Sequence, residues 1–439
     1  MWKHEIARVG TPHLRRRSWT RSLEFVAALG GVVMLTFALA AVARPAPLRS
    51  ASRLVDLRAI PESILRRPAV VVLDVDDQAF GELVANPERR GRRWERPATI
   101  AFLGDGIVRF DSPVGVRVHG GGSRASSDRS LRLYFRESLG SVVPTGPRVG
   151  LVGGGRHESL VLHGDIRRDT GGQPFHYVNP LGYDIARRLG VIAAETNPVT
   201  LVLNGGPPKP FVVTEHLNLD FLEARFGHRS FRTYDTKNER DAERLETEGP
   251  IAELRARYGA QENWTLERIQ RHVDVDNLAR WFLLVSFCGT RDEMQGVAVH
   301  DDSRPDGKWF WVAWDVDHSF GRRDRWSAPR WSIDQFDRIF SGDPRANPGR
   351  NADARVVLLR HLFGSSAPFR RSFAALWTTT RDSLLTQPFL EERLSFYERS
   401  AARHGVSDVR YQRDVREFLR LRPAAIQEQL DRLLDNYLD

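Results

Sequence analysis

The sequence contains little cysteine and little lysine. Its one cysteine, Cys288, excludes a disulfide framework, a cysteine-based zinc site and an iron–sulfur cluster. Among the 65 basic residues, the only lysines are Lys3, Lys209, Lys237 and Lys308, and the others are arginines. A site that requires an ammonium group must therefore use one of these positions.

Basic charge is also scarce over most of the chain. The formal net charge is +9, but residues 1–68 hold 12 Lys and Arg against 4 Asp and Glu, which is +8 and leaves only +1 for residues 69–439. DNA-binding domains usually have a basic body, because phosphate neutralisation supplies much of their affinity. We therefore expect no nucleic-acid partner. The 23 Phe and 11 Trp supply enough apolar surface to exclude a disordered chain.

One long apolar run lies near the N-terminus. Residues 25–43 contain no charged side chain, and as a helix they would span roughly 28 Å, about one hydrocarbon core. A basic tail precedes this predicted transmembrane helix at 1–24, and a linker follows it at 44–68. The basic excess before the run predicts a single-pass protein of the cell membrane with its body outside the cytoplasm. The alternative is a signal peptide cleaved after Ala43, which gives the body the same location.

The pattern in the body changes from strands to helices. Residues 69–222 form the predicted strand-rich lobe, with a β-branched run at 70–75 and a hairpin turn at 204–206. Residues 223–439 form the predicted helical lobe, which includes a helix capped by Asp276 and a last helix that begins at Pro423. Strands first and helices later predict an α+β protein with two unequal lobes.

Two carboxylates follow an aromatic run in the helical lobe. Residues 308–314 are rich in Trp and Phe, and Asp315 and Asp317 follow two positions apart, before a turn that closes at Gly321. Carboxylate oxygens are the ligands that magnesium and calcium prefer. The pattern indicates a metal site at the end of a buried strand. The alternative is a solvated turn, which is the more frequent meaning of a bare Asp-x-Asp.

A second polar segment directly follows an apolar helix. Core packing of the helix would fix the position of residues 288–295, where Asp292 could orient a hydroxyl or hold a metal. The alternative is that Asp292 caps a helix.

A glycine-rich segment follows a predicted strand. At Gly121, Gly122 and Ser123 backbone N–H groups could approach a phosphate, with Arg124 and Arg129 available to pair with its charge. The segment is neither a Walker A motif nor G-x-G-x-x-G, and a plain turn is the alternative. The histidines do not cluster at metal-ligand spacing, and no G-x-S-x-G motif is present.

Taken together, these segments resemble the CotH family of spore-coat-type proteins, which are distantly similar to protein kinases. Five blocks occur in the family's order. They are the glycine-rich segment 115–124, the helix 179–190, the strand pair from Asn204 to Glu215, Asp292 after its apolar helix, and the W-D-x-D-x-x-x-G block at 314–321. A weaker similarity lies at 418–423.

The resemblance implies a two-lobed, protein-kinase-like fold and phosphoryl transfer from ATP to protein Ser or Thr. It assigns metal binding to Asp315, with Asp317 and Gln295 as further ligands. Asp292 would be the second essential acid, either base or metal ligand. Glu215 would steady a phosphate-binding basic residue, for which Lys237, Arg129 and Arg132 are candidates.

We therefore expect a membrane-anchored, CotH-like kinase that uses ATP and a divalent metal, magnesium or manganese with calcium as the alternative. Its partner would be a protein substrate at the cell envelope. A catalytically inactive interaction protein of the envelope and a nucleotidyl transferase are the alternatives. The presence of both Asp292 and Asp315 favours the enzyme.

Overall fold

The computed structural model divides the chain into two compact units, residues 1–49 and 50–439. All described residues lie in the second unit: 52, 54–121, 124, 128–164, 177–236, 239–290, 296–321, 330–340, 353–405 and 409–436.

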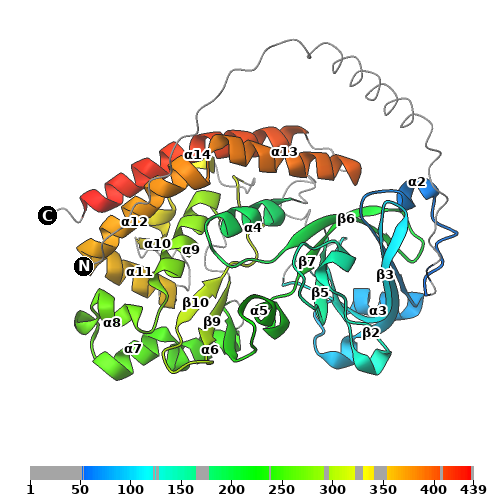
Figure 1. Cartoon of the computed structure of the whole chain (residues 1–439), viewed down its shortest axis with the longest axis horizontal. Coiled ribbons are helices and arrows are strands. Elements are labelled where there is room, and N and C mark those ends of the chain that lie inside the picture. The colour runs from blue at the N-terminus through cyan, green and yellow to red at the C-terminus, as the bar shows by residue number, and fades with distance from the viewer. Residues whose placement is uncertain are drawn as a thin grey trace, which may run out of the picture. The chain divides into compact units, whose positions relative to one another are not determined.

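The N-terminal part of this unit is a closed barrel of seven strands in the order β1-β2-β3-β4-β5-β7-β6 (Figure 1). Six neighbouring pairs are antiparallel, and the barrel closes where β1 pairs in parallel with β6, so that Val70 lies opposite Thr200. The strands are β1 Val70–Val75, β2 Arg96–Gly104, β3 Ile107–Val118, β4 Leu131–Tyr134, β5 Ser159–His163, β6 Thr196–Leu203 and β7 Lys209–Glu215.

Alternate residues of each strand fill the barrel interior. Leu73, Ile100, Val116 and Leu133 belong to this inner cluster, because successive side chains of a strand point to opposite faces. The opposite face of β1 is also buried, against a second cluster that includes Val55, Ile60 and Leu65. Burial of both faces explains why β1 is a continuous apolar run rather than an alternating one.

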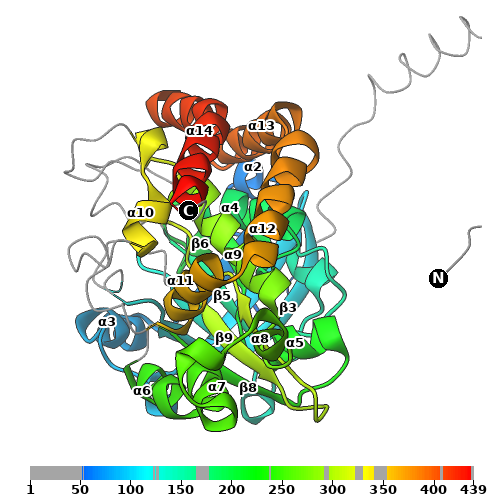
Figure 2. The same cartoon turned by 90° about the vertical axis from the view of Figure 1, so that its left-hand side faces the viewer.

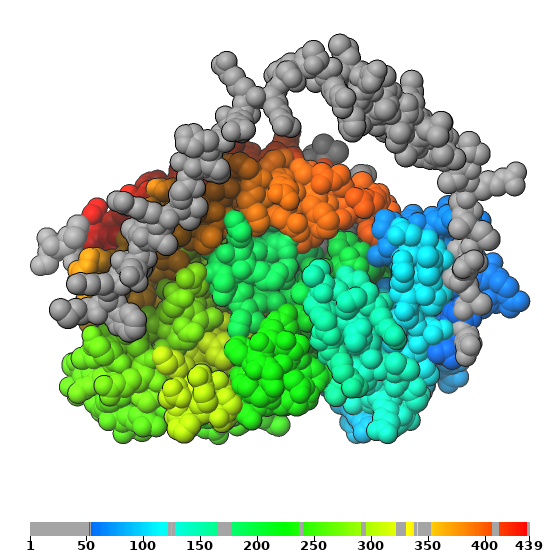
Figure 3. Space-filling view, in the orientation of Figure 1, coloured from blue at the N-terminus to red at the C-terminus, as the bar shows by residue number. Residues whose placement is uncertain are grey.

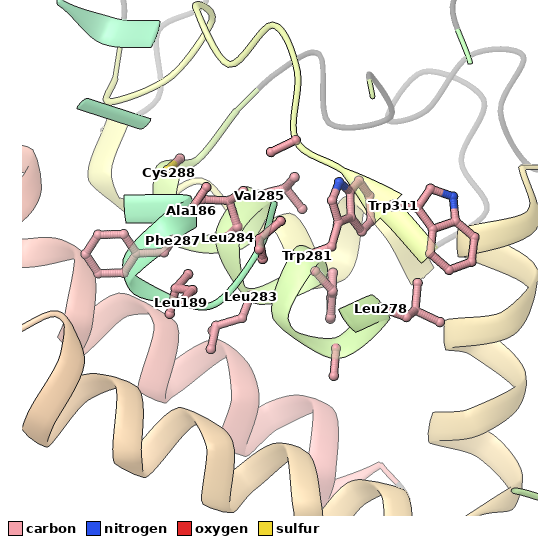
Figure 4. Packing of buried hydrophobic residues seen from close by; sticks show 14 of the residues in the cluster. Ala186, Leu189, Leu278, Trp281, Leu283, Leu284, Val285, Phe287, Cys288 and Trp311 are labelled. Carbon is pink, nitrogen blue, oxygen red and sulfur yellow. The ribbon is translucent and has the colours of Figure 1, made fainter. Parts of the chain in front are cut away.

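Helix α9 (Val275–Cys288) is the centre of the C-terminal part. Nearly all its side chains are buried, and Figure 4 shows them packed with Ala186 of α4, with Leu189 just after α4 and with Trp311 of β10. The helix begins two residues earlier than predicted, because the side chain of Asp274 rather than Asp276 accepts the capping bond from Asn277 N–H. Asp276 instead pairs with Arg280 on the first turn.

A three-stranded sheet and a shell of helices surround α9. The sheet has the order β10-β9-β8 (Trp309–Val312, Val297–Asp301 and Phe231–Asp235). Seen from the side of these helices, the shell lies in front of the barrel (Figure 2). The helices of this shell are α4 Val178–Arg188, α5 Leu219–Phe226, α6 Glu239–Glu248, α7 Pro250–Tyr258, α8 Leu266–Gln270, α10 Gln335–Phe340, α11 Ala354–Ser365, α12 Ala367–Thr379, α13 Gln387–Arg403 and α14 Val409–Asp435, with short helical turns η6 Gln261–Asn263, η7 Arg330–Ser332 and η8 Thr380–Leu384. The barrel part has the helices α2 Glu62–Leu65 and α3 Asp77–Ala85 and the short turns η1 Arg92–Trp94, η3 Glu137–Leu139 and η4 Gly146–Val149.

Helix α13 connects the two parts. Its surface runs over α4 toward the barrel strands (Figure 3). Arg393 and Tyr397 of α13 both bond Asp184 of α4, and His404 at the end of α13 lies 2.8 Å from the hydroxyl of Thr200 on β6. These contacts hold α4 between the barrel and the C-terminal helices.

The predicted fold class is wrong. The strand-rich part is a closed seven-stranded barrel with a separate three-stranded sheet, not the first lobe of a two-lobed, protein-kinase-like fold behind a transmembrane helix. Local periodicity predicted most of the strands but not the pairing of β1 with β6, which joins segments far apart in sequence. No helix among the described residues has the length and apolar character to cross a membrane. The predicted span, 25–43, lies outside these residues, and the membrane location stays a prediction.

The prediction that Pro423 begins the last helix is also wrong. Pro423 lies inside α14. A proline within a helix has no N–H for the carbonyl four residues before it, here that of Leu419. The side chain of Gln387 donates to this carbonyl at 3.0 Å, so the freed acceptor is satisfied and the helix continues.

Candidate functional site

The predicted metal-binding carboxylates lie in a loop that follows β10. This segment, Ala313–Gly321, is called the acidic loop below. Every residue of β10 is buried, so the strand fixes where the loop begins. Asp315 has a φ of 58°, in the left-handed region that aspartate tolerates better than most side chains. The loop closes where Phe320 N–H donates to the carbonyl of Cys288 at the end of α9, at 2.9 Å.

Helix α4 holds the acidic loop from one side. The hydroxyl of Tyr183 accepts a hydrogen bond from Asp315 N–H at 3.0 Å. A Cβ at Gly182 would collide with Val316, so only glycine allows this close approach of the helix. Burial, and then the nearby carboxylates of Asp315 and Asp317, raise the pKa of the Tyr183 hydroxyl well above its usual value. Both carboxylates therefore lie within electrostatic reach of one buried tyrosine.

A set of basic side chains lies on the outer face of the barrel opposite this loop. It comprises Arg117, His119, Arg132, His163 and His216 and is called the cationic face below. Strand alternation places these side chains outward, because Val116 and Leu133 point inward. Arg117 and Arg132 are direct cross-strand partners in the β3–β4 register. Like charges directly opposite each other destabilise a sheet.

The two arginines of the cationic face are only partly satisfied. Both guanidinium groups lie over the ring of Tyr134, at 5.2 and 4.8 Å from its centroid. Arg132 also donates to the hydroxyl of Ser159 at 3.3 Å. Within the described part of the chain, the Nε atoms of Arg117 and Arg132 are buried and have no hydrogen-bond partner. An anion bound here would relieve both the repulsion and the unmet donors.

Three histidines of the cationic face meet although they are distant in sequence. The ring of His119 lies 5.8 Å from that of His163 and 6.2 Å from that of His216. Burial and then the other basic groups hold the pKa of His119 well below its usual value, and burial with Arg132 does the same for His216. Burial also lowers the pKa of His163, against the attraction of Asp315.

Trp314 joins the cationic face to the acidic loop. Its ring centroid lies 6.5 Å from that of His119 and 6.1 Å from that of His163, and it stacks on Tyr183 at 6.3 Å. The residue directly before Asp315 therefore packs against two histidines of the barrel, whose lowered pKa values favour the uncharged ring. The structure thus brings together His119 after β3, His163 of β5, Tyr183 of α4 and the acidic loop.

The predicted glycine-rich phosphate loop is described only in part. Gly122 and Ser123 lie outside the described residues, and a Cβ at Gly121 would meet no atom within 4 Å. Arg124 is buried and donates to the carbonyls of Gly120 and Pro87 at 2.5 and 2.6 Å. Arg129 donates to the carbonyl of Val84 at 2.9 Å. These bonds tie the two arginines to the segment around the end of α3, and their phosphate role stays a prediction.

Glu215 is buried at the end of β7. It pairs with Arg225 of α5 at 2.5 Å and accepts the Glu195 N–H at 2.8 Å. In the described contacts, therefore, Glu215 fixes α5 against the barrel. The basic residue that it steadies is Arg225, which was not among the candidates for phosphate binding.

Asp292 and Gln295 lie outside the described residues, so their predicted roles stay untested. The described chain reaches Thr290, just past Gly289, which ends α9 in the left-handed conformation. Because the Cys288 carbonyl accepts the Phe320 N–H, the end of α9 lies beside the closing end of the acidic loop.

The metal-binding role predicted for Asp315 and Asp317 stays a prediction. Among the described residues, no group of three or more His, Cys, Asp or Glu side chains could hold a metal ion. Magnesium in phosphoryl-transfer sites is usually held by one or two carboxylates together with phosphates of the substrate. Asp315 and Asp317, near the same tyrosine, supply such a pair.

Comparison with known proteins gives one family. The family model described as CotH kinase protein matches residues 116–437, from within β3 to beyond α14. This match confirms the resemblance inferred from the five sequence blocks. No curated protein matches the chain significantly.

Proposed function

The chain belongs to the CotH kinase family, and from this premise we propose that it is a metal-dependent phosphotransferase. It would transfer the γ-phosphoryl group of ATP to a Ser or Thr hydroxyl of a protein. The observation that carries this proposal is the cationic face of the barrel lying against the acidic loop through Trp314.

The two sides of the site have complementary tasks in this reaction. Arg132 and Arg117 have buried, unmet Nε donors within the described residues, and they would bind phosphate oxygens. Asp315 and Asp317 would hold a magnesium or manganese ion, which neutralises charge on the transferred phosphoryl group. Such a division suits phosphoryl transfer, where positioning and charge neutralisation contribute most of the catalysis.

At the γ-phosphorus, the transfer forms one bond to oxygen and breaks another. The oxygen of the acceptor hydroxyl attacks the γ-phosphorus, and the bond from that phosphorus to the bridging oxygen of the β-phosphate breaks, so that ADP leaves. The hydroxyl proton passes to a base, the role that the family resemblance offers to Asp292. The arginines of the cationic face would hold the β- and γ-phosphates in line with the acceptor.

The test compares two aspartates with the same backbone conformation. Asp315→Asn keeps a side chain that tolerates positive φ but removes the charge. Asp105→Asn is the matched control, because Asp105 also has a positive φ (52°) but lies in the β2–β3 turn. We expect Asp315→Asn to abolish metal-dependent ATP binding and label transfer from γ-labelled ATP, and Asp105→Asn to leave both unchanged. Unchanged transfer by Asp315→Asn would refute the site.

The same assay separates the alternatives. Transfer of label from α-labelled but not γ-labelled ATP would indicate a nucleotidyl transferase. A folded wild-type chain that binds no nucleotide in the presence of either metal would instead be an interaction protein.

A further inference from the structure

Arg422 of α14 is wholly buried and takes no part in the site described so far. Its Nε donates to the carbonyls of Ser286 and Phe287 at 3.1 and 3.2 Å, and its Nη1 to those of Trp331 and Ile333 at 2.6 and 2.7 Å. A buried charge is costly unless its donors are satisfied. Here the acceptors are backbone carbonyls, two of them at the C-terminal end of α9, where the helix dipole is negative.

The carbonyls that Arg422 holds adjoin the closing end of the acidic loop. Cys288, the next residue after Phe287, accepts the N–H of Phe320. Phe418, one turn before Arg422, packs edge-on against the Phe320 ring at 5.9 Å. A Cβ at Gly289 would lie only 3.1 Å from Phe418. One face of α14 thus contacts both the end of α9 and the end of the acidic loop.

Arg422 also binds the carbonyls of Trp331 and Ile333, and two further contacts hold the segment that contains them. Gln429 of α14 donates to the Ile333 carbonyl at 3.1 Å. Gln335, also buried, donates to the carbonyl of Thr290. The segment 331–335 is therefore fixed between α14 and the residue at which the described chain leaves α9.

We propose that Arg422 is a positioning residue for phosphoryl transfer, which by holding the end of α9 sets the geometry of the acidic loop at Asp315. The inference rests on the proposed function. Arg422 acts through the backbone of Ser286–Cys288 and Phe320, and it touches neither nucleotide nor metal. Replacing it displaces the carboxylates from the metal while the phosphate-binding arginines of the barrel keep their places.

The experiment measures metal and nucleotide binding separately on the full chain. A non-hydrolysable ATP analogue is titrated by calorimetry without metal, and magnesium is then titrated into the analogue complex. We expect Arg422→Lys, which keeps the charge but not the planar fork of donors, to raise the magnesium concentration for half-saturation about tenfold, as loss of a supporting contact does at metal sites. The affinity for the analogue without metal should stay within about twofold of the wild type, because sites that share no partners act nearly independently.

Two further variants keep the test decisive. Phe418→Leu loosens the contact with Phe320 without disturbing a buried charge, and we expect the same shift in the magnesium midpoint. Leu430→Ala, a buried position on the same helix, is the control for a merely structural role, because it lowers the melting temperature but leaves the magnesium midpoint unchanged. A midpoint equal to the wild type in both Arg422→Lys and Phe418→Leu, or an equal shift in Leu430→Ala, overturns the proposal.

The failure of the proposed function has a different signature. If the wild-type chain binds the analogue in neither titration, the proposed function is wrong, and Arg422 has no role in it. A wild-type chain that binds analogue and magnesium normally, with unshifted variants, leaves the proposed function intact and removes only the role of Arg422.

Discussion

Two sets of arginines in this protein differ in how their charge is satisfied. Arg422 is fully buried, and its nitrogens donate to backbone carbonyls. Arg117 and Arg132 lie side by side on the barrel, and their buried Nε atoms have no partner among the described residues. A satisfied cation stabilises the fold, whereas an unsatisfied like-charged pair costs stability and is typical of a surface that binds an anion.

The largest expected effect comes from replacing Arg422, whose charge is satisfied. In Arg422→Met the carbonyls of Phe287 and Trp331 lose the donor described above, while those of Ser286 and Ile333 keep another one. We expect the free energy of unfolding to fall by about 2–6 kcal/mol, because each buried acceptor left unsatisfied costs about 1–3 kcal/mol. Urea denaturation followed by tryptophan fluorescence measures the change. A loss below about 1 kcal/mol, the size of an ordinary hydrogen bond, would mean that the two sets of arginines do not differ.

Arg132→Met tests the other side of the comparison. Removing a repelling charge should leave stability unchanged or higher, but ATP affinity should fall about tenfold or more, because hydrogen bonds to charged groups contribute about 1.5–3 kcal/mol. Arg136→Met is the control, since Arg136 also lies over Tyr134 but its donors are used by Glu95 at 2.6 Å. Equal loss of ATP affinity in both variants would argue against a specific phosphate contact.

Gly182→Ala tests how closely α4 must approach the acidic loop. The new methyl group would overlap Val316, and overpacking of this kind costs about 1–3 kcal/mol. We expect weaker magnesium binding in the nucleotide complex as well, because Val316 lies between Asp315 and Asp317. The double variant Gly182→Ala/Val316→Ala should recover most of both losses, and additive losses in the double variant would contradict the contact.

The histidines of the cationic face predict how stability depends on pH. The pKa values of His119 and His216 are lowered in the folded protein, so the unfolded chain binds protons that the folded chain does not. Their contribution is therefore fully present above the unfolded value of about 6.5 and is lost as pH falls below it, by at most about 1.4 kcal/mol per pH unit for each histidine. Urea midpoints from pH 7.5 to 5 should fall less in His119→Gln/His216→Gln than in the wild type, and an equal fall in both proteins would contradict this account.

Gln387→Leu has the smallest expected effect. It removes the donor to the Leu419 carbonyl that Pro423 leaves without an intrahelical partner. We expect a loss of about 1 kcal/mol in the wild type, as for one buried hydrogen bond. In a Pro423→Ala background the carbonyl regains its helical N–H, and Gln387→Leu should then be nearly neutral. An undiminished loss in that background would contradict this account of the proline.

Much of the local structure could be predicted from the sequence, because it depends on neighbouring residues. Alternation predicted the strands around Val116 and Leu133, and the apolar helix that ends at Cys288 was predicted with only its cap misplaced. The barrel could not be predicted in this way, since its closure depends on Val70 pairing with Thr200. Spacing within a window carries no information about a partner 130 positions away.

The sequence pointed to the acidic side of the candidate site and to one of its two arginines, Arg132, but not to Arg117 or to the three histidines. Asp315 and Asp317 lie two positions apart and directly follow an aromatic strand, which made them easy to find in the sequence. The histidines at 119, 163 and 216 share no spacing. Each histidine, however, lies at or just past the end of a strand, at a position whose side chain points away from the barrel interior. This alternation with the apolar positions of the strand was the signal available in the sequence.

The parallel pairing of β1 with β6 has a consequence for synthesis on the ribosome. β1 leaves the exit tunnel long before β6, and at about 5–20 residues per second the delay for roughly 130 residues is about 7–25 s. During that interval one edge of a valine-rich strand has no neighbour, which makes nascent chains of this protein candidates for chaperone capture. Arrested chains in which β6 has not yet left the tunnel should be cleaved by protease within residues 70–75, and chains in which β6 and β7 have both left the tunnel should resist.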